Sequence, residues 1–305
     1  MTREELNEDK QEEILKEENR KARKQVIKKI VKYTVILIIF LYAFFFYAEN
    51  VSTVKIIVNE ERITNAKIPI SFNGLKIIHF SDLHYGSNID KDKVKEVVTL
   101  INKRKPDIVV FTGDLIDKSI ELDNKEQESL ITELQKIDSP LGKYAIIGDE
   151  DKDNYSTIMN QSNFVVLNNE YDLVYNKTND ALLITGFSSS LNNTIDINKA
   201  LDYFNLDFAN TNIYSIGLLH EPDSADDILN IHQMDLLLAG HSHNGNVRIP
   251  FIGSVTKRNG AKKYDQAYYK INNSKLYISS GIGTEDNGIR LFCRPSINFY
   301  RLSNS

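Results

Sequence analysis

Cysteine is nearly absent from this 305-residue chain, which contains Cys293 alone. A single cysteine excludes an intrachain disulfide framework, so cysteine pairing gives no indication of the cellular compartment. An excess of basic residues is missing too, because 37 lysines and arginines face 42 aspartates and glutamates, for a formal net charge of −5 at pH 7. A nucleic-acid-binding protein normally carries a basic face, so we expect no nucleic acid partner. With 41% hydrophobic and 26% charged residues, the composition is that of a globular protein long enough to bury a core.

The N-terminal part has a different composition. Residues 1–29 are dominated by Glu, Lys, Arg, Asn and Gln, which indicates a charged tail that is either a solvated helix or disordered. The sequence YTVILIIFLYAFFFYA then covers residues 33–48 without a charge, and counting back across Lys32 to Ile30 extends the run to 19 residues. About 20 apolar residues cross a bilayer, and a lysine near the end of the run can snorkel to the interface. We therefore predict one N-terminal transmembrane helix over residues 30–48.

Basic residues crowd the N-terminal side of this run, and Glu49 follows it. They are Lys21, Arg23, Lys24, Lys28, Lys29 and Lys32. The positive-inside rule then predicts a single-pass protein of the cell membrane, with a cytoplasmic N-terminus and everything after residue 50 outside. A cleaved signal peptide is the competing interpretation, but the preceding segment is long and partly acidic, and Phe46 and Ala48 form no small-x-small cleavage site. A buried core helix is a second alternative, yet a run that is apolar on all sides is not amphipathic.

Beyond the apolar run, the pattern predicts a linker with one or two edge strands over residues 49–70, and one globular domain over residues 71–305. In the first half of that domain, buried strands are predicted over 75–80, 108–112 and 143–147, and amphipathic helices over 90–103 and 130–137. This alternation is typical of a mainly parallel sheet covered by helices. The second half is richer in strands than one sheet holds comfortably, so we expect two packed sheets with outer helices.

Acidic residues and histidines recur where the predicted strands end. The chain has six histidines, and four of them lie at such positions. In chain order the candidates are Asp82, His84, Asp114, Asp149, Glu150, His220, His241 and His243. Because ligand sites of α/β sheets are built at strand ends, we expect these side chains to gather at one edge. Mixed carboxylate and imidazole ligands suit Mn²⁺, Zn²⁺ or Fe. So many ligands exceed what one tetrahedral ion takes, but they suit two ions that share a bridging carboxylate, about 3.5–4 Å apart.

This order and spacing is similar to that of the calcineurin-like metallophosphoesterases, whose signature runs D-x-H, G-D, G-N-H-D/E, H and G-H-x-H. The resemblance covers about residues 70 to 302. Within it, the segments FNGLKIIHFSDLHYG, GHSHNGNVRIP, KYDQAYYKI and GIRLFCRPSI resemble the membrane-associated bacterial branch of that family. The resemblance implies an α/β fold, a four-layer αββα sandwich, with two metal ions at the sheet edge.

The resemblance also implies a role for each matching position. Asp82, His84 and His243 would hold the first ion, and Asp114 would bridge to the second. The second ion would be held by His220, His241 and the residue at the Asn position of the third motif, Asp149. A hydroxide shared by the two ions would then attack the phosphorus of a phosphomonoester or phosphodiester. A lipid head group is one candidate substrate, because the domain is tethered at the bilayer. The sequence carries no signal for the oligomeric state.

The chain departs from the family at the third motif, where G-N-H-D is replaced by Gly148-Asp149-Glu150-Asp151. Glu150 stands where the family has a histidine that contacts phosphate and helps the leaving group. In a crowded acidic site its pKa could rise enough for it to act as general acid, which is our hypothesis for a catalytic residue. The alternative is a catalytically weakened metal-binding protein that recognises a phosphorylated ligand. Asp151 is expected to cap a turn, not to bind metal.

Overall fold

The computed structural model describes residues 3–50, 55–207, 209–249, 251–284 and 288–304. The chain divides into two units, Met1–Asn50 and Val51–Ser305, and each is described by itself. Residues 51–54, which belong to the linker expected over residues 49–70, lie outside the described part of the chain.

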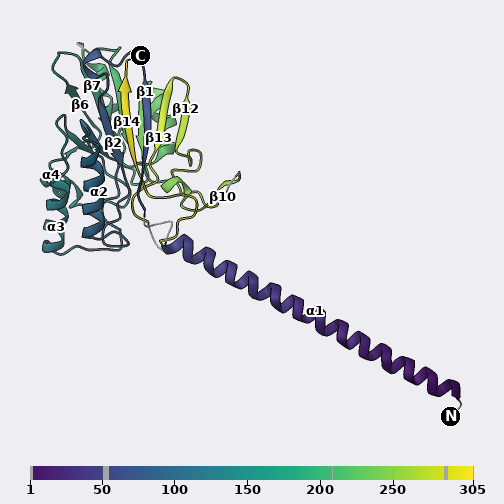
Figure 1. Ribbon diagram of the computed structural model, residues 1–305. Helices are drawn as coiled ribbons and strands as arrows, with labels where there is room; N and C mark the ends of the chain where they lie inside the picture. Colours follow the sequence, from purple (N-terminus) through teal and green to yellow (C-terminus); the bar gives the residue numbers. More distant parts are fainter. Residues whose placement is uncertain (1–2, 51–54, 208, 250, 285–287, 305) are drawn as a thin grey trace. The chain divides into compact units, whose positions relative to one another are not determined.

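The first unit is one α-helix, α1 (Arg3–Asn50), that contains both the charged tail and the apolar run (Figure 1). The stretch Glu13–Ala48 is long and apolar enough to cross a membrane, and none of its most apolar window is buried by other parts of the chain. Large apolar side chains such as Ile36 and Phe40 are exposed. A helix that is apolar all round needs an apolar environment, which is what the interior of a bilayer provides. The long apolar N-terminal helix expected from the sequence is thus confirmed.

The second unit contains two mixed sheets of six strands each. The first has the order β1 (Ile57–Thr64), β14 (Ser296–Ser303), β2 (Lys76–Phe80), β3 (Ile108–Phe111), β4 (Lys143–Ala145) and β5 (Val165–Val166). The second has the order β12 (Tyr268–Ile271), β13 (Ser274–Ile278), β9 (Leu236–Ala239), β8 (Tyr214–Leu219), β7 (Ala181–Gly186) and β6 (Glu170–Tyr175). A separate hairpin joins β10 (Arg248–Ile249) to β11 (Gly253–Ser254). β1 is an edge strand, as expected, and pairs in parallel with the C-terminal strand β14.

Helices cover the outer face of each sheet, and Figure 1 shows those beside the first sheet. They are α2 (Lys91–Lys103), α3 (Asn124–Gln135) and α4 (Tyr155–Gln161) beside the first sheet, and α5 (Ile197–Ala200) and α6 (Ala225–Ile231) beside the second. Short 3-10 helices occupy η1 (Ile70–Phe72), η2 (Asp202–Asn205), η3 (Pro222–Ser224) and η4 (His243–Gly245).

The helix predicted over residues 130–137 begins earlier than its apolar spacing indicates. Asp123 and Glu126 form a capping box, in which each side chain accepts a hydrogen bond from the backbone N–H of the other residue. This box satisfies two N–H groups that would otherwise lack partners and starts α3 at Asn124. The first turns of α3 are polar and exposed, so periodicity alone does not reveal them.

Alternating side chains on each strand separate the apolar layers. On β2, Ile77 packs between the two sheets, whereas its neighbour Ile78 packs under the outer helices. On β9, Leu238 lies between the sheets and Leu237 packs against α6. The order of layers is therefore helix, sheet, sheet, helix. This confirms the four-layer αββα sandwich implied by the resemblance.

The strand directions explain where the polar motifs gather. β2, β3 and β4 run parallel, and so do β8 and β9 in the facing sheet. The loops that follow these strands therefore emerge at the same edge of the sandwich. Those loops carry every acid and histidine singled out from the sequence.

Candidate metal centre

The loops that carry the predicted ligands have unusual backbone conformations. Asp82, His84, Asp114, His241 and His243 all have positive φ, between 46° and 60°. This left-handed region costs a residue with a side chain about 1–3 kcal/mol and persists only where the surroundings impose it. Five residues with this conformation face one site, which is typical of a functional centre.

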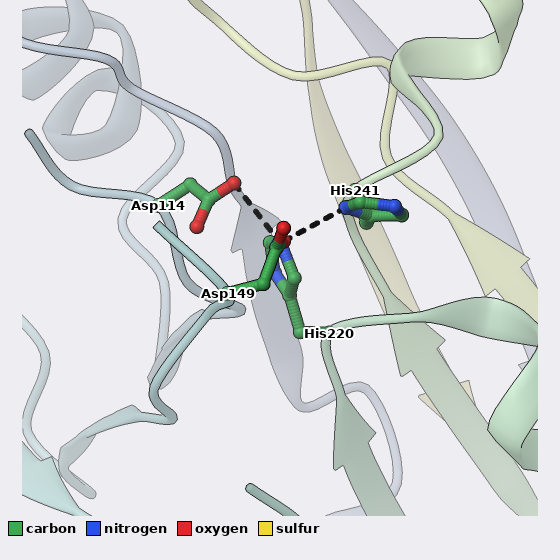
Figure 2. Close-up of side chains that lie close together, drawn as sticks. All are labelled: Asp114, Asp149, His220 and His241. Carbon is green, nitrogen blue, oxygen red and sulfur yellow. Dashed lines mark ion pairs between the residues drawn. The ribbon is translucent and has the colours of Figure 1, made fainter. Parts of the chain in front are cut away.

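One group of side chains consists of Asp114, Asp149, His220 and His241 (Figure 2). Nε2 of His220 lies 3.1 Å from Oδ2 of Asp114 and 3.0 Å from Oδ1 of Asp149. Nδ1 of His241 lies 3.0 Å from the same oxygen of Asp149. Figure 2 shows the four side chains pointing toward one another from separate loops.

A second group consists of Asp82, His84 and His243, all fully buried. Nε2 of His84 lies 3.2 Å from Nε2 of His243, which in turn lies 3.5 Å from Oδ1 of Asp82. Asp114 connects this group to the first, because its Oδ2 is also 4.0 Å from Nε2 of His84. The structure thus brings together all seven residues predicted as ligands, with Asp114 between the two groups.

Backbone carbonyls orient two of the histidines in the first group. Nδ1 of His220 donates a hydrogen bond to the carbonyl of Thr112 at 2.6 Å, which leaves Nε2 facing the carboxylates. His241 is turned the other way, since its Nε2 donates to the carbonyl of Asn259 at 2.7 Å and its Nδ1 faces Asp149. Such outer hydrogen bonds fix the ring and the nitrogen that a metal would use. They are missing from the sequence prediction because a carbonyl has no residue-type signature.

The donor atoms fit divalent metal ions. Within the described ranges, Oδ2 of Asp114, Oδ1 of Asp149 and Nε2 of His220 are buried and have no hydrogen-bond partner beyond the contacts that they make with one another and with His241. Buried polar atoms are almost always satisfied, so three together facing one point indicate an ion. Burial disfavours the charged form of His220, but Asp114 and Asp149 outweigh it and raise the pKa of His220 well above its ordinary value. Burial raises the pKa of Asp114, but the neighbouring His220 and His84 outweigh burial and lower the pKa below its ordinary value.

Comparison with known proteins agrees with this geometry. A sequence profile described as calcineurin-like phosphoesterase matches residues 75–245, more than half of the chain. The chain belongs to the calcineurin-like phosphoesterase family. This confirms the resemblance on which the site prediction depends. Members of the family typically bind divalent metals, and the two groups of acids and histidines supply matching donors.

Relatives cover most of the phosphoesterase domain. The uncharacterized metallophosphoesterase YkuE of Bacillus subtilis (strain 168) is 28% identical over 264 residues, which cover 85% of this chain and 90% of YkuE. A transmembrane protein with metallophosphoesterase domain from Danio rerio is 26% identical over 194 residues, which cover 59% of this chain and 42% of that protein. The crystal structure of a dimetal phosphatase from Danio rerio superposes on 69% of this chain and 88% of its own with a TM-score of 0.44 and 10% identity.

Glu150, which stands at the histidine position of the third motif, has a partner at each of its two oxygens. Oε1 accepts a hydrogen bond from Nζ of Lys118 at 2.7 Å, and Oε2 lies 3.4 Å from Nδ1 of His84. Burial alone would raise the pKa of Glu150, but His84 and Lys118 outweigh it and lower the pKa below its ordinary value. The raised pKa expected from the sequence is therefore wrong, because the motif pattern did not reveal the partner Lys118. A catalytic role of Glu150 stays a prediction.

The side chain of Asp151 connects two of the ligand loops by hydrogen bonds. Its oxygens accept hydrogen bonds from the backbone N–H groups of Asp114, Leu115 and Gly148 at 2.8–2.9 Å. The expected capping role is thus found, and it extends to both the Asp114 loop and the Asp149 loop.

Two glycines allow these loops to touch. A Cβ placed on Gly113 would come within 2.6 Å of Nδ1 of His220 and 2.7 Å of Cα of Gly148. A Cβ on Gly148 would meet the carboxylate and backbone nitrogen of Asp114. No side chain fits at either position unless a ligand residue moves.

Arg290 is a charged residue beside the site that sequence reasoning missed. It is fully buried and donates hydrogen bonds to the carbonyls of Ser280 and Gly283, each at 2.6 Å. Its Nη2 lies 3.3 Å from Nδ1 of His243. Burial, together with Arg258, His84 and Arg290, lowers the pKa of His243 well below its ordinary value and so keeps the imidazole neutral. Arg290 lies in the segment GIRLFCRPSI, and the resemblance of this segment to the family was the feature of the sequence that could have revealed Arg290.

Proposed function

We propose that this protein is a membrane-anchored, two-metal phosphohydrolase that cleaves a phosphomonoester or phosphodiester. The observation that carries the proposal is the position of Asp114, whose Oδ2 faces His220 of one group at 3.1 Å and His84 of the other at 4.0 Å. A carboxylate shared by two groups of ligands is the arrangement that a binuclear centre requires.

The side chains have separate roles in this proposal. Asp82, His84 and His243 hold the first ion, and Asp149, His220 and His241 hold the second, with Asp114 between them. When bound, two divalent ions such as Mn²⁺, Zn²⁺ or Fe supply an activated water for attack on phosphorus and neutralise the charge that develops.

The chain's own contribution is to fix the donor atoms. Asp151 and the two close-packed glycines hold the carboxylates in place, and the carbonyls behind His220 and His241 fix their rings. Positioning of this kind avoids reorganisation of the site during the reaction.

A turnover assay on the purified full chain tests the proposal. Hydrolysis of p-nitrophenyl phosphate and bis(p-nitrophenyl) phosphate is measured with Mn²⁺, Zn²⁺ or Fe²⁺ added after chelation. His241→Ala is expected to abolish hydrolysis, whereas His232→Ala leaves it unchanged, because His232 stacks on Phe204 away from the centre. Equal activity of the two variants would contradict the proposal.

We further propose that α1 spans the cell membrane with its N-terminus in the cytoplasm and the phosphoesterase domain outside. The support is the apolar stretch of the helix and the cluster of basic residues that precedes it. A phosphoester in a lipid head group is then a candidate substrate, since the domain is held at the bilayer. Protease added to intact cells is expected to remove the domain, and a domain that survives until the cells are lysed would contradict the orientation.

A second candidate function is recognition of a phosphorylated ligand without turnover. The observation that favours it is Glu150, a carboxylate beside the position where a substrate phosphate would bind, with its pKa lowered and its charge retained. Metal content and turnover separate the two functions. Two bound ions without hydrolysis of any phosphoester in a broad panel would favour the binding protein.

A further inference from the structure

Large apolar side chains are exposed together on the β10–β11 hairpin and next to it. We use the term apolar tip for Ile249, Phe251, Ile252, Val255 and Phe292. Phe251 is fully exposed, Ile252 is 78% exposed and Phe292 is 61% exposed. Four of the five residues line the same surface groove. Single exposed apolar residues are common, but a contiguous group indicates a surface that is covered by something else.

The apolar tip is attached firmly to a metal-ligand loop. The hairpin begins three residues after the end of η4 (His243–Gly245), which contains a predicted ligand. Nη1 of Arg248 donates to the carbonyl of Asn244 at 3.0 Å and to the carbonyl of Asp265 at 2.9 Å. The hydroxyl of Ser254, on β11, donates to the carboxylate of Asp265. Whatever binds the tip is therefore held at a fixed position beside the metal centre.

Exposed basic residues border the apolar tip. Lys257 follows Val255 by two residues, and Arg294 follows Phe292 by two residues. Asp265 is buried and lies 3.6 Å from Nζ of Lys257, and Glu60 and Glu61 line the same pocket as Arg294. Apolar residues flanked by lysine and arginine are typical of segments that lie in the interface of an anionic bilayer.

The chain also enters the domain at this end. The backbone N–H of Ile57 donates to the carbonyl of Pro295 at 2.9 Å, and Ile57 and Phe292 line one pocket. Lys55, just before, is exposed. Six residues separate Lys55 from Ala48, the last residue of the apolar run. The chain between them can span at most about 25 Å, so a bilayer that holds the run lies within that distance of Lys55.

We propose that the apolar tip inserts into the anionic bilayer that holds α1 and keeps the metal centre at the level of the lipid head groups. The inference rests on the proposed membrane anchor but not on turnover. Its occupant is the lipid surface, because the basic border matches anionic head groups and the fully exposed Phe251 matches the acyl region. A second copy of the chain or a protein partner are outcomes that the test would reveal.

The absence of tryptophan from the chain allows a direct test. In Phe251→Trp the introduced side chain is the only tryptophan, and its emission reports its surroundings. The full chain is reconstituted into vesicles of phosphatidylglycerol and phosphatidylcholine. Its emission maximum is expected at a shorter wavelength than that of a tryptophan exposed to water. The emission is also expected to be quenched when the lipids carry brominated acyl chains.

Tyr175→Trp is the matched control. Tyr175 is 53% exposed and pairs with Ala181 at the start of β7, the end of the sheet opposite to the metal loops. Its tryptophan is expected to emit as in water, to be quenched by aqueous acrylamide and to be unaffected by brominated lipid.

Each remaining outcome decides the inference. Water-like emission of Phe251→Trp in vesicles overturns it. Protection from acrylamide without quenching by brominated lipid also overturns it, because that result would indicate a protein partner or a second copy of the chain.

Flotation of the vesicles separates this failure from failure of the anchor. A chain that floats while its Phe251→Trp side chain stays in water overturns the tip alone, whereas a chain that does not float overturns both. Loss of phosphoester hydrolysis would change neither the conclusion on the apolar tip nor that on the membrane anchor.

Discussion

The carboxylate of Glu150 lies behind the imidazole of His84, with Oε2 at 3.4 Å from Nδ1. The opposite nitrogen of the ring, Nε2, faces His243 and Asp114. A carboxylate behind a metal-facing histidine fixes the orientation of the ring and raises its basicity. Lys118, at 2.7 Å from Oε1, keeps the carboxylate in place and ionised. Glu150 is therefore suited to act through His84 as a positioning residue.

Glu150→Gln tests this relationship. We expect the affinity for the first metal ion to fall by about 10–100-fold, because the amide lacks the charge that supports the imidazole. Isothermal titration calorimetry with Mn²⁺ measures the affinity. Glu128→Gln, an exposed position on α3, is the matched control and should bind as wild type. Unchanged affinity combined with loss of the basic limb of the pH–rate profile would instead identify Glu150 as the general acid predicted from the sequence.

Gly148→Ala tests the close approach of the two loops. The added Cβ would overlap with the carboxylate of Asp114, so we expect the variant to fold but to bind fewer than two ions. Gly74→Ala is the control, because Gly74 has positive φ and open space around it, and the substitution adds only backbone strain of about 1 kcal/mol. Mass spectrometry of the metal content of both variants gives the result. A Gly148→Ala protein with two ions would show that the loops can separate without loss of the site.

Asp151→Ala is expected to destabilise the domain more than a surface substitution does. Three buried backbone N–H groups lose their acceptor, and each unsatisfied group costs about 1–3 kcal/mol. The thermal midpoint of unfolding should fall by several degrees, and Asp151→Asn, which keeps one acceptor oxygen, should lie between the two proteins. Asp153→Ala, at an exposed neighbouring position, should melt as wild type. An unchanged midpoint in Asp151→Ala would mean that water replaces the carboxylate.

The sequence was sufficient to predict two packed sheets with outer helices, because the predicted strands are too many for one sheet, and the family resemblance implied the four-layer sandwich. The convergence of the ligands followed from motifs placed where parallel strands end. It was insufficient where an interaction joins residues without a motif. The start of α3 depends on Asp123 and Glu126, and the pKa of Glu150 depends on Lys118, 32 residues earlier. The outer support of His241 is the carbonyl of Asn259, which any residue type could supply. These partners are set by the tertiary packing.

Lys143 gives the stability of the domain a dependence on pH above neutrality. Burial lowers the pKa of Lys143 to about 8, from 10.5. Between these values the unfolded chain binds a proton that the folded chain does not, so this residue makes the free energy of unfolding rise with pH. Between about pH 8 and pH 10, we expect the urea concentration at the unfolding midpoint to rise in wild type relative to that of Lys143→Met. Lys125→Met, an exposed control on α3, should follow wild type, and parallel curves for wild type and Lys143→Met would refute the effect.

Asp114 and His241 are predicted to differ in how many ions their loss removes. The side chain of His241 faces the group around Asp149, and its contact with Asp82 of the other group is made by the backbone N–H, which alanine keeps. His241→Ala should therefore keep the first ion and bind one per chain. Asp114 faces both groups, and without its charge the remaining ligands of each site hold a divalent ion less strongly. Asp114→Ala should therefore lose both ions at metal concentrations that saturate wild type. Equal stoichiometry in the two variants would mean that Asp114 belongs to one site alone, and the binuclear arrangement would have to be abandoned.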